Sequence, residues 1–541
     1  MWGRNLFFIA LLVAGAFGLR ASLFPLRTEA RKIKFDPTPT QADDVRAVVA
    51  EVDDSFRAAW AAKSLTPTGR ADDLTVARRL SLALTGSVPA LEDIRQFEQQ
   101  PAETRASGWA HHLLQDRRFA DYFADRLARA YVGTDDGPLV SYRRRKFVAW
   151  LSDEFMNNAS YAEVVRRMIA AEGLNTDVPA VNFVAATYDE NKKAPDPEKL
   201  AVRVSRAFLG LRIDCAQCHD HFLEPTWKQS DFQALAAFFG QTKQSVTNIA
   251  DTLTGEYRFE DRVEGGTHEA KPGVPFLPEL LPPHGPRRHR LAQWVTDPRN
   301  LYFARATVNR MWAMMFGRPL LRRVESQTLA EMSDEKVPPA LRILARDFAA
   351  HDYDLRRLIL LISATEAFRL DSAADFDITD AHEDAWAVFP LTRLRPEQVI
   401  GSVIQAASVK TINQQSHIFV RLTRYFNEKD FVKRYGDISD DEFERAAGTI
   451  PQRLLMMNGD LVDGKAKEEL LSASTQIAMF SPDDPTAVET AYLAVLTRRP
   501  TDQEKAHFTA KLTGTAGDDR KRKLADLYWT LFNSTELSWN H

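Results

Sequence analysis

The chain is poor in cysteine and has no large excess of either charge. Only two of its 541 residues are cysteine, so a framework of several disulfides is excluded. Its 70 Lys and Arg stand against 74 Asp and Glu, which gives a net charge of −4 at pH 7. No domain-wide basic excess is present to neutralise backbone phosphates, so we expect no nucleic-acid partner.

Common enzyme signatures are also missing. The sequence has no glycine-rich phosphate loop, GxSxG elbow, HExxH helix or calcium loop. It therefore leaves open whether the protein is an enzyme. With 44% apolar and 27% charged residues, the chain has an ordinary globular composition and is long enough for two or three domains with substantial cores.

An unbroken apolar run occupies residues 6–19, behind Arg4. This is the charged and apolar pattern of a secretory signal. Leu19-Arg20-Ala21 is a poor cleavage site, and residues 5–26 are long enough to span a bilayer. We expect residues 1–27 to be a signal peptide or an uncleaved N-terminal membrane anchor. Either would place the protein in the periplasm or cell envelope, and the second would attach it to the inner membrane.

The two cysteines lie three residues apart and are followed by a histidine, in the pentapeptide Cys-Ala-Gln-Cys-His at residues 215–219. In c-type haem attachment the two thiols add to the haem vinyl groups, and the histidine binds the iron. The motif thus predicts covalent haem on Cys215 and Cys218, with His219 as the axial iron ligand.

Two other interpretations of this motif stay open. Cys215 and Cys218 can form a disulfide or a dithiol, with His219 tuning the thiols. Alternatively, the two cysteines, His219 and His221 can hold zinc, although four ligands within seven residues make a cramped tetrahedron. Asp220 with His221 is a candidate polar site, or simply caps the loop.

A bound haem would need side chains that pack against its edge and a sixth ligand for its iron, and the sequence offers candidates for both. Candidate residues for the haem edge, which core packing explains equally, are Phe222, Trp227, Phe232, Phe238 and Phe239. Candidates for the sixth iron ligand, again with core filling as the alternative, are Met311, Met314 and Met315. An open sixth position would permit small-ligand chemistry instead.

Apolar spacing is mostly helical, so we expect a mainly α, multi-helix, two-domain architecture. Helices are predicted in residues 74–85, 146–156, 161–172 and 197–211, with Ser230 as the N-cap of another and Thr501 with Glu504 as a capping box. Residues 242–290 are rich in proline and glycine, which predicts a linker or a small irregular or strand-bearing insert. The expected domains are residues 28–241 with the CxxCH motif and residues 291–541.

Two short basic clusters are better explained as solvated helix ends than as anion sites. They are residues 143–146 and the group Arg287, Arg288 and Arg290.

Several blocks resemble the planctomycete cytochrome c-like proteins, a family of largely uncharacterised role. CAQCHDHFLEPTWKQSDFQALAAFF is similar to the family signature, and LTVARRLSLALTGSVPALEDIRQF to the start of the same domain. The later half resembles the planctomycete-specific domain that follows it, through the blocks RATVNRMWAMMFGRPLLR, DLRRLILLISATEAFR, TIPQRLLMMNGDLV and AYLAVLTRRPTDQE.

The resemblance implies one haem at most, on Cys215, Cys218 and His219. The chain departs from the family pattern around residues 337–339 and after residue 365. The function expected is an exported or membrane-anchored mono-haem c-type protein with a redox or electron-transfer role, which meets an unidentified redox partner or envelope protein. The alternative is a haem-free envelope hydrolase or binding module for polysaccharide, in which the motif is a disulfide or a metal site.

Overall fold

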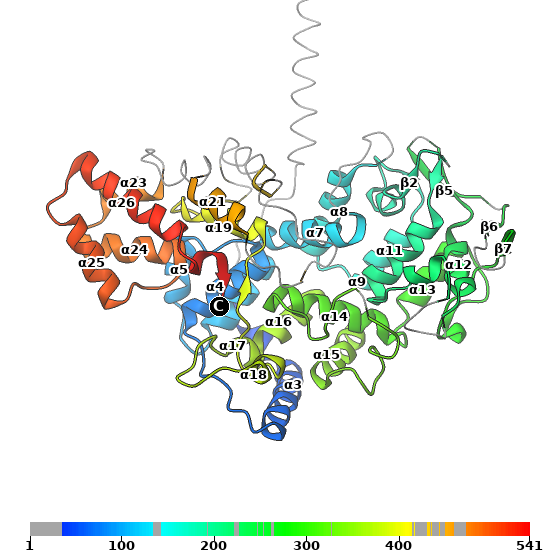
Figure 1. The fold of residues 1–541 in the computed structure, drawn as a ribbon, viewed down its shortest axis with the longest axis horizontal. Helices are drawn as coiled ribbons and strands as arrows, with labels where there is room; N and C mark the ends of the chain where they lie inside the picture. Colours follow the sequence, from blue (N-terminus) through cyan, green and yellow to red (C-terminus); the bar gives the residue numbers. More distant parts are fainter. Residues whose placement is uncertain are drawn as a thin grey trace, which may run out of the picture.

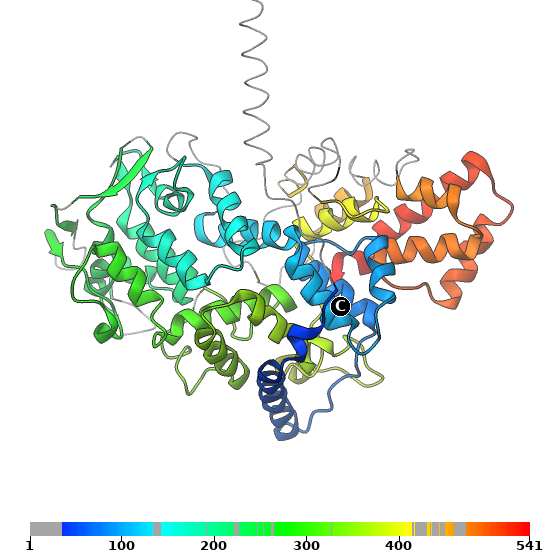
Figure 2. The same ribbon diagram turned by 180° about the vertical axis from the view of Figure 1, so that it is seen from behind.

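The structure is a computed structural model and is mainly helical, as the apolar spacing predicts (Figure 1). It describes residues 35–541 except 134–141, 192, 221–226, 246, 253, 261–264, 326, 414–415, 417–429, 433, 435–442, 444–448 and 459–471. Figures 1 and 2 show an elongated molecule, with helices α23 (Ala473–Phe480) to α26 (Gly517–Phe532) at one end. Helices α11 (Pro197–Leu209) to α13 (Arg287–Val295) and strands β5 (Asn248–Asp251) to β7 (Thr267–Ala270) lie at the other end.

The helices before the strand-bearing insert come first in the chain. They are α2 (Thr38–Gln41), α3 (Asp43–Ala62), α4 (Asp73–Thr85), α5 (Leu91–Glu98), α6 (Arg105–Gln115), α7 (Arg117–Val132), α8 (Arg144–Met156), α9 (Tyr161–Ala170), α10 (Asn182–Ala185), α11 (Pro197–Leu209) and α12 (Gln229–Ala236). Short 3₁₀ helices lie among them: η1 (Pro179–Val181), η2 (Asp214–Gln217) and η3 (Ala237–Phe239).

A second set of helices follows the insert. They are α13 (Arg287–Val295), α14 (Leu301–Phe316), α15 (Pro339–Ala350), α16 (Leu355–Ala364), α17 (Glu366–Arg369), α18 (Asp380–Asp384), α19 (Pro396–Ala406), α21 (Ile450–Asn458), α23 (Ala473–Phe480), α24 (Asp484–Leu496), α25 (Asp502–Leu512) and α26 (Gly517–Phe532). Two 3₁₀ helices accompany them, η4 (Pro278–Leu280) and η5 (Glu536–Ser538).

The predicted insert carries strands, as expected. Strands β4 (Thr242–Ser245) and β5 (Asn248–Asp251) pair antiparallel, and β1 (Gly173–Leu174) completes their sheet in the order β1-β5-β4. Strands β6 (Tyr257–Glu260) and β7 (Thr267–Ala270) pair antiparallel. Elsewhere β2 (Tyr188–Asp189) pairs with β3 (Ala194–Pro195), and β8 (Thr392–Arg393) with β9 (Trp539–Asn540).

Local sequence signals set several helix ends. The Asp72 carboxylate accepts from the main-chain N–H groups of Leu74 and Thr75 at the start of α4, and Gly86 ends that helix at φ +70°. The capping box of Thr501 and Glu504 on α25 is present. Ser230 as an N-cap is wrong: the N-cap is Lys228, two residues earlier, because the Asp231 carboxylate accepts from the main-chain N–H of Lys228.

The hydrophobic core runs through both expected domains. One cluster of buried side chains includes Phe208 of α11 together with Trp294 and Phe303 from beyond the insert. A second cluster joins Leu82 and Val88 to helices α19, α23, α24 and α26. The boundaries at 241/242 and 290/291 stay predictions, and apolar packing crosses both of them.

Candidate functional site

Cys215 and Cys218 lie just after helix α11, where the chain reverses beside it. Gly210 ends α11 in the left-handed region, at φ +67°. A Cβ atom there would lie 3.2 Å from both the Cβ of Ala306 and the carbonyl oxygen of Val324, so glycine suits both the backbone angle and the close approach. This turn directs the chain towards η2, on which the first cysteine sits.

A segment from the later half of the chain holds the approach to the cysteines. The main-chain N–H of Gln327 donates to the carbonyl oxygen of Gly210 at 2.9 Å, and Leu211 pairs with Gln327 in a parallel bridge. The Arg206 guanidinium also donates to the Asp214 carboxylate at 2.6 Å, immediately before Cys215. The thiol segment is therefore fixed by contacts from α11 and from beyond the insert.

The 3₁₀ helix determines how the two thiols face. Cys215 is the second residue of η2, and Cys218 is its C-cap with φ −112° and ψ −21°. Side chains at i and i+3 of a 3₁₀ helix eclipse, and three residues advance the chain by about 6 Å. Disulfides join residues whose Cα atoms are ~4.4–6.8 Å apart, so this turn suits a bridge. Both cysteines are half-buried and carry thiols rather than a disulfide.

Gln217, between the two cysteines, is anchored through its side chain and its main chain. Its Nε2 donates to Oε2 of Glu198, in the first turn of α11, at 2.7 Å. Its carbonyl oxygen accepts from Nε2 of Gln229 at 3.1 Å, and Nε2 of Gln233 lies 3.5 Å from the same oxygen. Both glutamines belong to α12 and are buried.

Tyr257 of β6 connects the strand-bearing insert to this cluster. Its hydroxyl donates to Oε1 of Gln233 at 2.7 Å and lies 3.4 Å from Oε1 of Glu198. Burial, followed by the negative charge of Glu198, raises the pKa of Tyr257, so the phenol keeps its proton and acts as a donor. We call Glu198, Gln217, Gln229, Gln233 and Tyr257 the glutamine cluster.

His219 and Asp220 face the surface. Nδ1 of His219 donates to the carbonyl oxygen of Asp220 at 2.7 Å. Oδ1 of Asp220 accepts from the main-chain N–H of Gln229 at 3.1 Å, which agrees with loop capping. His221 and Phe222 lie outside the described residues.

The structure contradicts the expected haem and zinc. Nowhere in the described parts of the chain do three or more His, Cys, Asp or Glu side chains gather in a way that could hold a metal ion. Cys215, Cys218 and His219 form no such group, and the exposed ring of His219 directs Nδ1 to the carbonyl oxygen of Asp220. The predictions of a haem c or zinc cofactor and of a metal-binding motif are corrected accordingly.

The residues expected around a haem belong to the protein core instead. Trp227, Phe232, Phe238 and Phe239 are buried members of the main hydrophobic cluster. So are the sixth-ligand candidates on α14, Met311, Met314 and Met315. Their apolar surface is already used in packing, which gives a physical reason why the haem expectation fails.

The basic clusters serve local structure. Arg288 is fully buried and donates to the Asp251 carboxylate at 2.8 Å and to the carbonyl oxygens of Ile169 and Ala171. Residues 144–146 lie in the first turn of α8, where Arg145 and Lys146 are exposed, as expected for a solvated helix end. The same expectation is wrong for the buried Arg288. Arg144 donates to the Asp125 carboxylate at 3.0 Å.

No helix within the described ranges is long and apolar enough to cross a membrane. The expected signal peptide or anchor in residues 1–27 lies outside those ranges.

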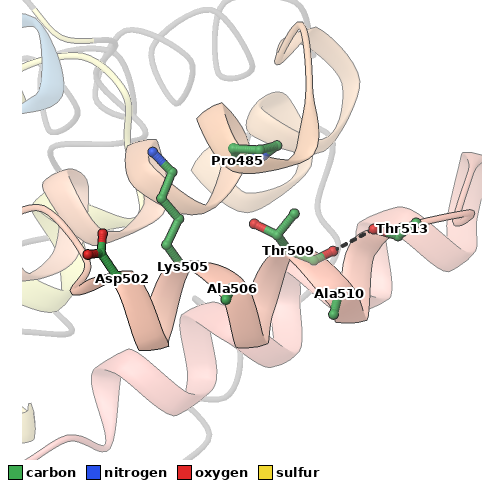
Figure 3. A pocket seen from close by; sticks show the side chains of 7 residues that line it. All are labelled: Pro485, Asp502, Lys505, Ala506, Thr509, Ala510 and Thr513. Carbon is green, nitrogen blue, oxygen red and sulfur yellow. Dashed lines mark hydrogen bonds between the residues drawn. The ribbon is translucent and has the colours of Figure 1, made fainter.

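A hollow of about 500 Å³ lies far from the cysteines, between the beginning of α24 and one face of α25 (Figure 3). Its lining residues are Pro485, Asp502, Lys505, Ala506, Thr509, Ala510 and Thr513. The Lys505 ammonium pairs with the Glu489 carboxylate at 3.2 Å, and the Thr513 hydroxyl donates to the carbonyl oxygen of Thr509. This surface groups no set of side chains with an evident chemical role.

Sequence reasoning missed the glutamine cluster. Glu198 looks like an ordinary acidic residue in the first turn of a helix, and Gln233 lies on the buried face of α12. Tyr257 stands 59 residues after Glu198, so no local spacing connects them. The local signal near this cluster is Asp196 followed by Pro197, an N-cap and a first-turn proline, and it indicates only where helix α11 starts.

Comparisons with known proteins match two segments of the chain and name no activity. Residues 51–244 match PSCyt2, a protein of unknown function (DUF1549), and residues 287–429 match PSD1, a protein of unknown function (DUF1553). No curated protein and no solved structure matches the chain. Neither match shows a cytochrome c domain. These two matched families are the planctomycete-type domain pair, which is consistent with the family that the sequence resembles.

Proposed function

We propose that this protein is a haem-free thiol–disulfide redox protein, in which Cys215 and Cys218 alternate between a dithiol and a disulfide. The observation that carries the proposal is the 3₁₀ turn with Cys218 as its C-cap, because side chains three residues apart in such a turn lie on one face. The chain has no other cysteine to compete for either thiol.

The exchange needs only the two thiols and a partner disulfide. One cysteine, as thiolate, attacks a sulfur of the partner disulfide; that S–S bond breaks, and the first partner thiolate leaves. The second cysteine then attacks the protein sulfur of the mixed disulfide and releases the other partner thiolate. Two electrons pass from the protein to the partner, and the two thiol protons end on the partner sulfurs.

The proposed compartment is the periplasm or cell envelope. The apolar run at residues 6–19 behind Arg4 supports export, and disulfides form and persist in oxidising compartments outside the cytosol. The proposed partner is an envelope protein with a disulfide or a dithiol. The polysaccharide hydrolase or binding module stays a prediction, since no contact favours it.

Trapping with oxidised glutathione tests this function. The wild-type protein should lose two thiols and gain no mass from glutathione, because the second cysteine resolves the adduct. Cys215→Ser and Cys218→Ser should each keep one glutathione, because each lacks a resolving thiol. Intact-mass spectrometry under non-reducing conditions reads both results. A stable adduct on the wild-type protein, or a covalent haem seen as visible absorption, would contradict the proposal.

A further inference from the structure

Gln217, one of the two residues between the cysteines, makes hydrogen bonds through both its side chain and its main chain. Gln217 donates to Glu198 through its side chain and accepts from α12 through its carbonyl oxygen. Both partners belong to helices, α11 and α12, which pack against each other. The turn that carries both cysteines is therefore hydrogen-bonded through Gln217 to two packed helices, α11 and α12.

A second layer of hydrogen bonds orients these partners. Nε2 of Gln233 donates to Oε1 of Glu198 at 3.1 Å, and Oε1 of Gln233 accepts from the Tyr257 hydroxyl at 2.7 Å. The two oxygens of Glu198 thus serve different donors, Oε2 for Gln217 and Oε1 for Gln233. Gln233 is 1% exposed, so water does not replace these contacts cheaply.

We infer that Glu198 and Gln233 are the positioning residues of the thiol pair, and that they set its redox potential. The inference rests on the proposed function. Closing a disulfide between two thiols is an intramolecular step, and its equilibrium depends on the effective concentration of one thiol near the other. A turn that is already fixed in the dithiol state loses less freedom on closing.

The effect is measurable as a potential. Release of Gln217 from Glu198 frees the turn, and we expect the effective concentration of the two thiols to fall about tenfold. For a two-electron couple this corresponds to about 30 mV, towards a more readily reduced disulfide. The insert takes part through Tyr257, whose loss should act in the same direction and less strongly.

Four variants separate positioning from general stability. Glu198→Ala removes both acceptors, and Gln233→Leu removes the amide with little change of volume. Glu198→Gln keeps one carbonyl oxygen and should recover part of the loss. Glu103→Ala changes an exposed glutamate of the same chain and serves as the matched control. Each variant is equilibrated with reduced and oxidised glutathione, and the fraction of disulfide is measured by mass after acid quenching.

The equilibrium constant for disulfide formation against glutathione should fall approximately tenfold in Glu198→Ala and Gln233→Leu. It should fall less in Glu198→Gln and stay unchanged in Glu103→Ala. If every variant has the same equilibrium constant for disulfide formation as the wild type, the inference is wrong and the proposed function still stands. A wild-type protein that forms no disulfide would overturn both. If Glu198→Ala or Gln233→Leu loses its helical circular dichroism signal, Tyr257→Phe replaces it as the test, because it removes only one hydroxyl. A shift of its redox equilibrium towards the dithiol supports the inference, and no shift contradicts it.

Discussion

The side-chain amide of Gln217 donates to the carboxylate of Glu198, with 2.7 Å between Nε2 and Oε2. Glu198 lies in the first turn of helix α11, and Gln217 follows the end of that helix. The chain must therefore run back along α11 for most of its length, about 16 Å at 1.5 Å per residue. This return places the CxxC turn against the same helix that leads into it.

Gly210 allows that return, so replacing it should destabilise the protein. Gly210→Ala strains a residue at φ +67° and brings a Cβ within 3.2 Å of Ala306 and Val324. We expect a loss of about 1–2 kcal/mol in the free energy of unfolding, measured by urea denaturation. Gly514→Ala is the matched control, since it has φ +77° with no atom within 4 Å. Equal losses in both variants would show that the crowding at Gly210 is unimportant.

Arg78 on helix α4 donates hydrogen bonds to the last residues of the chain. It is 1% exposed, and its guanidinium donates to main-chain carbonyl oxygens at 3.3–3.5 Å, those of Leu496, Glu536, Leu537 and Trp539. Arg78→Met leaves these carbonyls without their donor and should cost about 2–4 kcal/mol. Thermal and urea unfolding measure the loss. The exposed Arg46→Met should change stability by less than about 0.5 kcal/mol, and a similar loss in both would refute this role for Arg78.

Glu397 lies between two buried guanidinium groups and should protect the fold against acid. Its carboxylate is 2.8 Å from Arg126 and 3.1 Å from Arg395. Burial alone would raise the pKa of Glu397, but the two arginines hold it below its usual value. The stability it adds is therefore present above the unfolded-state pKa, near 4.5, and is lost as the pH falls through the folded-state value.

Glu397→Gln should cost about 3 kcal/mol at pH 7, because two charges lose their buried partner. It should also make the unfolding free energy less dependent on pH below about 4.5. Denaturation curves between pH 3 and pH 7 test both effects. A variant with the wild-type stability and pH slope would contradict the account.

Asp53 has the opposite pH dependence. Burial, and next the charge of Glu366, raise its pKa to about 6, while the main-chain N–H of Glu366 donates to Oδ1 at 2.7 Å. A raised carboxyl pKa means that the folded state holds the proton more tightly, so stability falls as the pH rises from about 4 to about 6. Full conversion of the shift gives about 3 kcal/mol, and solvent screening reduces it to on the order of 1 kcal/mol.

Asp53→Asn should remove this decline, because the amide oxygen still accepts from Glu366 and carries no charge. The comparison is between unfolding free energies at pH 4 and pH 7 for the wild type and the variant. Asp177→Asn changes an exposed carboxylate and should keep the wild-type pH dependence. A decline that persists in Asp53→Asn would assign it to another group.

The sequence predicted the features that depend on neighbours along the chain. Helix α4 with its stop at Gly86, the capping box at Thr501 and the strand-bearing insert all follow from local spacing and backbone preference. Ser230 failed as an N-cap because Asp231 satisfies the main-chain N–H of Lys228 and starts α12 earlier.

The site depended on contacts that no local pattern reveals. The CxxCH spacing indicated haem, and the expected haem neighbours Trp227 and Met311 are instead packed in the core. Glu198 and Tyr257 meet through the return of the chain and the placement of the insert. The sequence alone locates the two thiols. The residues that hydrogen-bond to the turn between them are identified only by their positions in the fold.

The central claim is that Cys215 and Cys218 form one thiol–disulfide couple, and a glutathione redox titration of the full chain tests it most directly. The account predicts one two-electron transition, in which both thiols disappear together without an increase in molecular size. Thiols that stay reduced across all buffers, a disulfide between two chains, or a covalently attached haem in the purified protein would contradict it.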